Sequence, residues 1–196
     1  MSEKRRKIAV MGGSFNPVHI GHLMLCNYIR QECGFDAVWL VLSPLNPLKQ
    51  NPEELLGDNV RLEMLRLACS GVDFVEACDV ELSMPKPSYT ISTLRELAKR
   101  YPDTDFCLII GADNWNIFTK WKCYDEIIRD FGVVVYPRPG YAIDKSENYT
   151  NVRFSDAPTF EISSTFVRNL IKNGGDPAFF VPDSVRRFIF ENNLYK

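Results

Sequence analysis

The sequence predicts an α/β fold, a doubly wound parallel sheet with helices on both faces. Strand and helix patterns alternate along the chain, which favours parallel strands joined by helical crossovers. Several strand candidates, such as 37–42 and 106–110, are unbroken apolar runs, typical of strands buried on both faces. Glycines and polar residues follow these runs directly, at the carboxyl ends of the strands, where such sheets bind ligands.

The first half of the chain begins with a strand over 8–11, a glycine turn and a helix with apolar residues at 23, 25, 26 and 29. A second strand over 37–42 leads into a proline-containing loop, 43–57. Asp58 is a candidate N-cap for the next helix, and Thr90 is a candidate N-cap for the one after it. The elements that follow position 70 are a weaker strand over 73–80, a helix over 91–100, a strand over 106–110, helical turns leading to a helix over 124–129, and a strand over 133–136.

The last part of the chain contains two further helices. A polar surface loop, 141–151, precedes a helix that starts at Ser163 or Ser164 and stops at Gly174, a plausible C′ glycine. Pro182 stands where the first turn of the final helix accepts proline. We therefore expect one domain over 1–196, with 1–6 disordered and with 159–196 as a C-terminal helical portion.

Composition narrows the function classes. The 196 residues carry a formal net charge of -2, which argues against a broad nucleic-acid surface. No apolar segment is long enough to span a bilayer, and the apolar run behind the basic start is too short for a signal peptide. The six cysteines show no CxxC spacing, which indicates a reducing compartment. We expect a cytoplasmic protein with neither nucleic acid nor membrane as a partner.

The stretch MGGSFNPVHIGH, 11–22, contains the only two histidines of the chain, His19 and His22. Glycines after a strand let the backbone approach a ligand, and a helix N-terminus attracts anions. Two histidines three residues apart share one helix face, so they converge on the same anion. Helix-start histidines are also common as surface or capping residues, and a zinc site would need the HExxH spacing or a nearby cysteine pair. The combination of a glycine turn, a helix N-terminus and two histidines favours a polyphosphate as the ligand.

A second anion cradle is predicted at ISSTFVR, 162–168. Ser163 and Ser164 stand at a helix N-terminus, and Arg168 follows about one turn later. Taken alone, this pattern fits a helix cap with a solvated arginine equally well. Two such cradles in one small α/β domain predict a triphosphate or two phosphorylated ligands.

The motifs GGSFNPVHIGH and ISSTFVR resemble those of the nucleotidyltransferase superfamily, (H/T)xGH and ISSTxxR. Further landmarks resemble the bacterial-type nicotinate mononucleotide adenylyltransferases: SYTISTL at 88–94, IGAD at 110–113, Trp121 with Tyr124 and Ile127, and RPG at 138–140. The resemblance covers nearly the whole chain. It implies a Rossmann-like fold and the joining of nicotinate mononucleotide and ATP to nicotinate adenine dinucleotide and pyrophosphate, in NAD biosynthesis.

The resemblance also implies roles for individual residues. His19, His22 and Arg168 would be catalytic and hold the ATP phosphates. Further ATP-binding positions would be Gly12, Gly13, Ser14, Phe15, Lys49, Gly111, Asp113, Ser163 and Ser164. Thr90, Trp121 and Arg138 would bind the mononucleotide, although Trp121 fits a core aromatic equally well. Mg²⁺ would be held through the ATP phosphates, and no residue is assigned to a metal.

Two positions depart from the family pattern. Leu48 stands where the family often has a histidine, which puts the catalytic share of that loop in doubt. Asn16 stands where the family often has an aspartate, so we assign it no acid role.

Other interpretations stay open. HIGH at 19–22 also occurs in class I aminoacyl-tRNA synthetases, but the chain has no KMSKS and no room for a tRNA-reading domain. Nearer alternatives are a nicotinamide mononucleotide adenylyltransferase, a phosphopantetheine adenylyltransferase, a cytidylyltransferase or a non-catalytic nucleotide-binding regulator. The sequence decides neither nicotinate against nicotinamide nor whether the chain forms a homo-oligomer.

Overall fold

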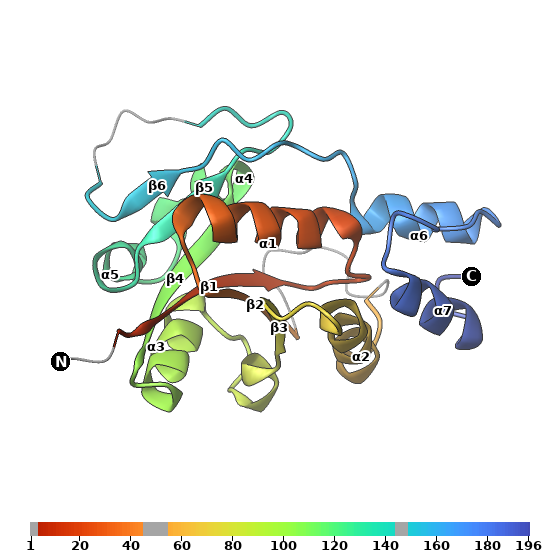
Figure 1. Cartoon of the computed structure of the whole chain (residues 1–196), viewed down its shortest axis with the longest axis horizontal. Coiled ribbons are helices and arrows are strands. Elements are labelled where there is room, and N and C mark those ends of the chain that lie inside the picture. The colour runs from red at the N-terminus through yellow and green to blue at the C-terminus, as the bar shows by residue number, and fades with distance from the viewer. Residues whose placement is uncertain (1–3, 45–54, 144–148) are drawn as a thin grey trace.

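The computed structural model describes residues 4–44, 55–143 and 149–196. Within these ranges the strands form one six-stranded sheet in the order β3-β2-β1-β4-β5-β6, with every pair of neighbours parallel (Figure 1). The strands are β1 (Arg6–Gly13), β2 (Ala37–Leu42), β3 (Val75–Cys78), β4 (Thr104–Gly111), β5 (Val133–Tyr136) and β6 (Val152–Phe154). The predicted doubly wound α/β fold is confirmed.

Helices cover both faces of this sheet. They are α1 (Ile20–Cys33), α2 (Asp58–Cys69), α3 (Thr90–Arg100), α4 (Ala112–Trp115), α5 (Tyr124–Asp130), α6 (Ser164–Lys172) and α7 (Asp183–Glu191), with short 3-10 helices at Val80–Ser83 and Phe118–Lys120. Helices α6 and α7 lie side by side beyond the carboxyl end of β1, at the opposite end of the molecule from the N-terminus (Figure 1). None of the described helices is long and apolar enough to cross a membrane.

The hydrophobic core has two halves because alternate residues of the central strands point to opposite faces. In β1, Ala9 and Met11 pack with α1, α2, α6 and α7, whereas Ile8 and Val10 pack with α3 and α5. All six residues of β2 are buried, as the unbroken apolar run predicted. The two helical layers therefore hold the sheet between them. The candidate site lies at the carboxyl ends of the strands.

The carboxyl ends of β1 and β4 lie next to each other at the point where the strand order reverses. Ile8 pairs with Ala37 of β2 on one side and with Phe106 of β4 on the other. Successive strands run outward from β1 to β2 and β3, and from β4 to β5 and β6. A crevice outside this reversal point is the usual ligand position in such sheets.

Several local expectations are corrected. The helix starting at Asp58 has Gly57 as its N-cap, and Tyr89, not Thr90, is the N-cap of α3; neither cap residue makes a side-chain cap bond. Pro182 is the N-cap of α7, one residue before its first turn. The Asp58 carboxylate is instead engaged by Arg61 within the first turn, at 2.6 Å.

The strand predicted over 73–80 is shorter, because its last part turns into the 3-10 helix at Val80. Strand β6 was not predicted at all. At the other end of the chain, residues 1–3 of the start expected to be disordered lie outside the described ranges. Strand β1 begins at Arg6, and Arg5 pairs with Asp105 at 2.6 Å.

Candidate active site

The loop between β1 and α1 forms the centre of the site. Gly13 ends β1, and a Cβ at this position would lie 2.9 Å from the ring of Phe15, so glycine is needed for the close packing. Phe15 itself is buried and has a φ of +42°, a conformation that few side chains adopt. The glycines therefore allow a tight turn that brings backbone N–H groups to the carboxyl edge of the sheet.

His19 and His22 share one face of the α1 start, as their spacing predicted. Their rings stack with centroids 3.6 Å apart, and the backbone N–H of His19 donates to Nδ1 of His22 at 3.1 Å. His19 is 7% exposed, and its Nδ1 atom is buried with no hydrogen-bond partner in the described part of the chain. This atom faces the first turn of its own helix: a Cβ on Gly21 would lie 3.1 Å from it, and the side chains and backbones of His19 and His22 have the reciprocal arrangement of a capping box.

The electrostatic environment of His19 disfavours its charged form. Burial, followed by the positive charge of nearby Arg138, lowers the pKa of His19 to about 4. The imidazole is therefore neutral at neutral pH in the free protein. An anion beside the ring would stabilise the imidazolium and shift this pKa upward.

The two predicted anion cradles lie against each other. Ser164 Oγ, at the start of α6, donates to the carbonyl of Pro17 at 2.8 Å. Arg168 Nη1 donates to the carbonyl of Asn16 at 3.0 Å. Ser163 caps the helix by accepting a bond from the N–H of Phe166. The motif at 162–168 thus packs on the same loop that carries the histidines.

Gly111, Asp113 and Arg138 gather at the ends of β4 and β5. Arg138 Nε lies 3.4 Å from the Asp113 carboxylate. A Cβ on Gly111 would come within 2.4 Å of that carboxylate and 2.9 Å of Arg138 Cγ, so a side chain at this position would have to displace both residues. Arg138 also lowers the pKa of His19, which shows that this group lies near the histidines.

Two of the three positions predicted for the mononucleotide, Thr90 and Trp121, lie on the helical layer of α3, whereas the third, Arg138, lies beside Asp113. Thr90 is the first residue of α3. Trp121 follows a 3-10 helix and is half-buried, with its ring 5.2 Å from that of Phe118 and its Nε1 buried without a partner among the described residues. Trp121 is thus in part a core aromatic. Lys49 and Leu48 lie outside the described residues.

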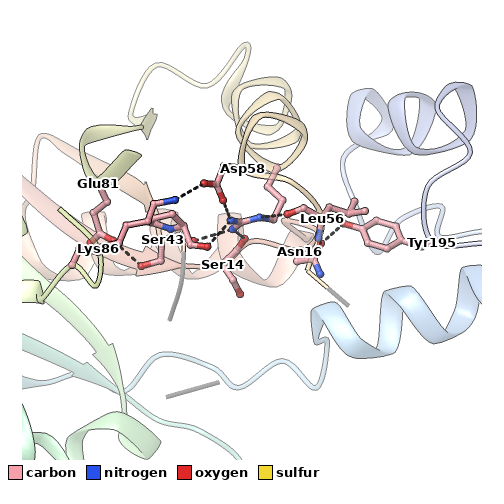
Figure 2. A network of polar contacts seen from close by, with 11 residues as sticks. Ser14, Asn16, Ser43, Leu56, Asp58, Glu81, Lys86 and Tyr195 are labelled. Carbon is pink, nitrogen blue, oxygen red and sulfur yellow. Dashed lines mark hydrogen bonds and ion pairs between the residues drawn. The ribbon is translucent and has the colours of Figure 1, made fainter. Parts of the chain in front are cut away.

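Sequence reasoning missed Arg61, the most buried charged residue of the site region. Its guanidinium, 0% exposed, donates to the carbonyls of Ser14, Ser43, Pro44 and Leu56 and pairs with Asp58 (Figure 2). Burial lowers the pKa of Arg61, and the Asp58 carboxylate opposes that shift. Arg61 therefore joins the ends of β1 and β2 to the start of α2. Its helical spacing from Met64, Leu65 and Ala68, all buried, was a usable signal.

A second missed residue, Glu81, extends this network. Its carboxylate is 6% exposed and accepts a bond from the hydroxyl of Ser43 at 2.9 Å (Figure 2). It also accepts from the hydroxyls of Ser88 at 2.7 Å and Thr93 at 2.8 Å. Ser43 joins the two centres because its carbonyl contacts Arg61 and its hydroxyl contacts Glu81. A continuous polar network thus connects the loop after β1 with the segment that leads to Thr90.

Comparisons with known proteins agree with this arrangement. A family model described as cytidylyltransferase-like matches residues 10–170. A relative from Bacteroides fragilis is 43% identical, with 95% of this chain and 92% of that protein covered. Another, from Azobacteroides pseudotrichonymphae, is 45% identical, with 97% and 99% covered. Both are named "Probable nicotinate-nucleotide adenylyltransferase".

A solved structure supports the fold independently. The nicotinic acid mononucleotide adenylyltransferase of Plasmodium falciparum, complexed with NaAD, superposes with a TM-score of 0.79 over 97% of both chains. At 19% identity this likeness concerns the fold. The family match over most of the chain and the long relatives above 40% identity lead to one conclusion: the chain belongs to the cytidylyltransferase-like family and, within it, to the nicotinate-nucleotide adenylyltransferases.

Proposed function

We propose that this protein transfers the adenylyl group of ATP to nicotinate mononucleotide, giving nicotinate adenine dinucleotide and pyrophosphate in NAD biosynthesis. The observation that carries the proposal is the packing of two anion-binding motifs on one loop, through Ser164 on Pro17 and Arg168 on Asn16. The shared names of the curated relatives support the choice of the mononucleotide. The free thiols of all six cysteines are compatible with a cytoplasmic setting.

The reaction needs no covalent intermediate. An oxygen of the 5′-phosphate of the mononucleotide forms a bond to the α-phosphorus of ATP, and the bond from that phosphorus to the bridging oxygen of pyrophosphate breaks. A phosphate dianion is already a competent nucleophile. The protein therefore contributes alignment of the two phosphates and stabilisation of the charge that develops on pyrophosphate.

His19, His22 and Arg168 are the proposed catalytic groups. Stacked imidazoles at the α1 start would donate to phosphate oxygens from one side, and the guanidinium on α6 from the other. His19 is neutral in the free protein, so the approach of the triphosphate would favour its protonation. Backbone N–H groups of Gly12, Gly13, Ser14 and Phe15, with Ser163 and Ser164, would complete the phosphate site.

The remaining assignments concern the nucleosides. Gly111 and Asp113, at the end of β4, would contact the base or ribose of ATP. Thr90, Trp121 and Arg138 would bind the mononucleotide. Trp121 offers a half-buried indole on which a pyridine ring can stack. Lys49 would bring a charge to the phosphates, a proposal that depends on the sequence alone.

Mg²⁺ would be bound by ATP oxygens and water rather than by a protein cage. The proposed site offers imidazole, hydroxyl and guanidinium groups from His19, Ser164 and Arg168, whereas Mg²⁺ prefers carboxylate and phosphate oxygens. That donor set fits a metal that enters already coordinated by phosphates. When bound there, Mg²⁺ neutralises part of the phosphate charge.

A substrate panel tests the proposal. Purified protein with MgATP would receive nicotinate mononucleotide, nicotinamide mononucleotide or phosphopantetheine, with pyrophosphate release as the readout. We expect the highest kcat/KM with nicotinate mononucleotide. A preference for either other acceptor would reassign the substrate, and ATP binding without pyrophosphate release would indicate a nucleotide-binding regulator.

A further inference from the structure

We propose that Tyr195 is a positioning residue for the phosphate-binding loop: its hydroxyl fixes Asn16, and Asn16 in turn holds Arg168. The inference rests on the proposed function, because it assumes that the loop and Arg168 bind ATP. Tyr195 lies outside both phosphate motifs in the sequence. Tyr195 itself makes no proposed contact with substrate. Its action would pass through Asn16.

The contact that carries the proposal is direct. Tyr195 Oη donates to Oδ1 of Asn16 at 2.8 Å, across 179 residues of sequence (Figure 2). The same oxygen accepts a longer bond, 3.4 Å, from the N–H of Leu56. An amide oxygen has two lone pairs, and these two donors occupy both. Asn16 is 4% exposed, so water cannot easily replace the tyrosine hydroxyl.

Asn16 transmits this constraint to Arg168. The backbone carbonyl of Asn16 accepts from Arg168 Nη1 at 3.0 Å, while its side-chain oxygen faces Tyr195. Asn16 therefore joins the loop to Tyr195 and to α6, next to the bond from Ser164 to the carbonyl of Pro17. Because His19 follows only three residues after Asn16, a movement of Asn16 would change the distance between the histidines and the guanidinium.

The backbone around Tyr195 supports a built contact rather than a loose chain end. Asn193 and Tyr195 have φ values of +51° and +62°, which cost conformational energy in residues other than glycine. The ring of Tyr195 packs on the core cluster shared by β1, α1 and α2. Burial raises the pKa of the Tyr195 hydroxyl well above its usual value, so the group stays protonated and remains a donor.

The test is Tyr195→Phe, which removes the hydroxyl and keeps the ring. The matched control is Tyr28→Phe, because Tyr28 is also partly buried and its hydroxyl donates to the carbonyl of Asp156 at 3.4 Å. Calorimetry would give the Kd for Mg²⁺ with α,β-methylene-ATP, and steady-state kinetics would give kcat and KM for each substrate. Thermal melting would report on the fold.

We expect Tyr195→Phe to weaken analogue binding about two- to tenfold, the usual effect of one neutral hydrogen bond. The kcat/KM for ATP should fall by a similar factor, while the KM for the mononucleotide stays within about twofold. Tyr28→Phe should leave all of these values unchanged. In an Asn16→Ala background the tyrosine substitution should have no further effect, because its partner oxygen is gone.

Two outcomes would overturn the inference. Unchanged analogue binding and kcat in Tyr195→Phe would show that the hydroxyl does not position the loop. Equal losses for both substrates together with a large fall in Tm would assign Tyr195 a structural role only. If the wild type binds the ATP analogue but forms no dinucleotide, the proposed function fails while the binding comparison still tests Tyr195.

Discussion

His19 and His22 have the same chemistry and a regular spacing, yet their surroundings differ. His19 is buried, with a lowered pKa and an unpartnered Nδ1 in the described structure, whereas His22 is only half-buried and accepts a bond from the His19 backbone. The spacing was enough to predict a shared face. The protonation state depends on burial and on Arg138, which lies more than one hundred residues away in sequence, and no local pattern reveals it.

Replacing His22 by alanine tests the phosphate site directly. Loss of one donor matched to the transition state typically costs about 2.7–4 kcal/mol of barrier. His22→Ala should therefore lower kcat about a hundredfold or more while the protein stays folded, measured by pyrophosphate release and circular dichroism. A folded variant with near-parental turnover would rule out this role for His22.

His19 gives the stability of the protein a defined pH dependence. Its pKa is about 4 in the folded protein, against an ordinary value of 6.5, so between these values the unfolded chain binds more protons. Above about pH 6.5 His19 is neutral in both states and does not lower the free energy of unfolding. As the pH falls towards 4, the unfolded chain is protonated at His19 first, and the free energy of unfolding decreases by up to about 3 kcal/mol.

The measurement for His19 compares urea unfolding of the wild type with that of His19→Gln at pH 7 and at pH 4.5. Carboxylates titrate in both proteins, so their effect cancels in the difference. The free energy of unfolding should fall more steeply in the wild type as the pH is lowered. Parallel curves would show that His19 is not held in its neutral form.

At the scale of elements, long apolar patterns were predictable and short elements were not. The central strands and most helices follow their sequence patterns. Strand β6 has only three residues, Val152–Phe154, with an exposed arginine in the middle, and it forms because β5 offers a free edge. The prediction of Asp58 as a helix cap was wrong for another reason. Its side chain has the right chemistry for a cap, but the buried Arg61 pairs with its carboxylate.

Arg61 should be worth far more to stability than its neighbours on α2. In Arg61→Met the carbonyls of Ser14, Ser43 and Pro44 lose a buried donor, which should lower the free energy of unfolding by about 3–5 kcal/mol. Arg66→Met is the control, since Arg66 is 56% exposed and pairs only with Asp79 among the described residues. Its loss should cost about 1 kcal/mol or less.

Urea denaturation of both variants would measure this difference. Arg61→Lys is a useful third variant, because it keeps the charge but not the planar fork that reaches several carbonyls at once. We expect it to recover only a minor part of the lost stability. Equal destabilisation by Arg61→Met and Arg66→Met would mean that the network does not hold the strand ends.

At the scale of the whole molecule, the site depends on contacts between segments about 150 residues apart. The sequence predicted both anion cradles and the fold that carries them. Their mutual packing, Arg168 on Asn16 and Ser164 on Pro17, could not be read from local patterns, because it depends on where α6 docks. The contact between Tyr195 and Asn16 could not be predicted for the same reason.

Because α6 docks across the loop after β1, a ligand held between them should stabilise the whole fold. MgATP at one hundred times its Kd adds about 2.7 kcal/mol, a rise in Tm of about 5–10 °C for a chain of this size. Arg168→Ala should reduce this shift, measured by calorimetric or fluorescence melting with and without MgATP. An identical shift in Arg168→Ala would place ATP elsewhere.

The position of β1 also has a consequence for biosynthesis. One edge of β1 pairs with β2, which follows soon after it in the sequence. The other edge pairs with β4, where Ile8 lies opposite Phe106, so this pairing forms only after β4 has been synthesised. At about 5–20 residues per second, the ribosome makes the intervening stretch in roughly 5–20 s. Throughout that interval one edge of β1 has no partner, so an apolar strand edge stays unpaired until β4 has been made.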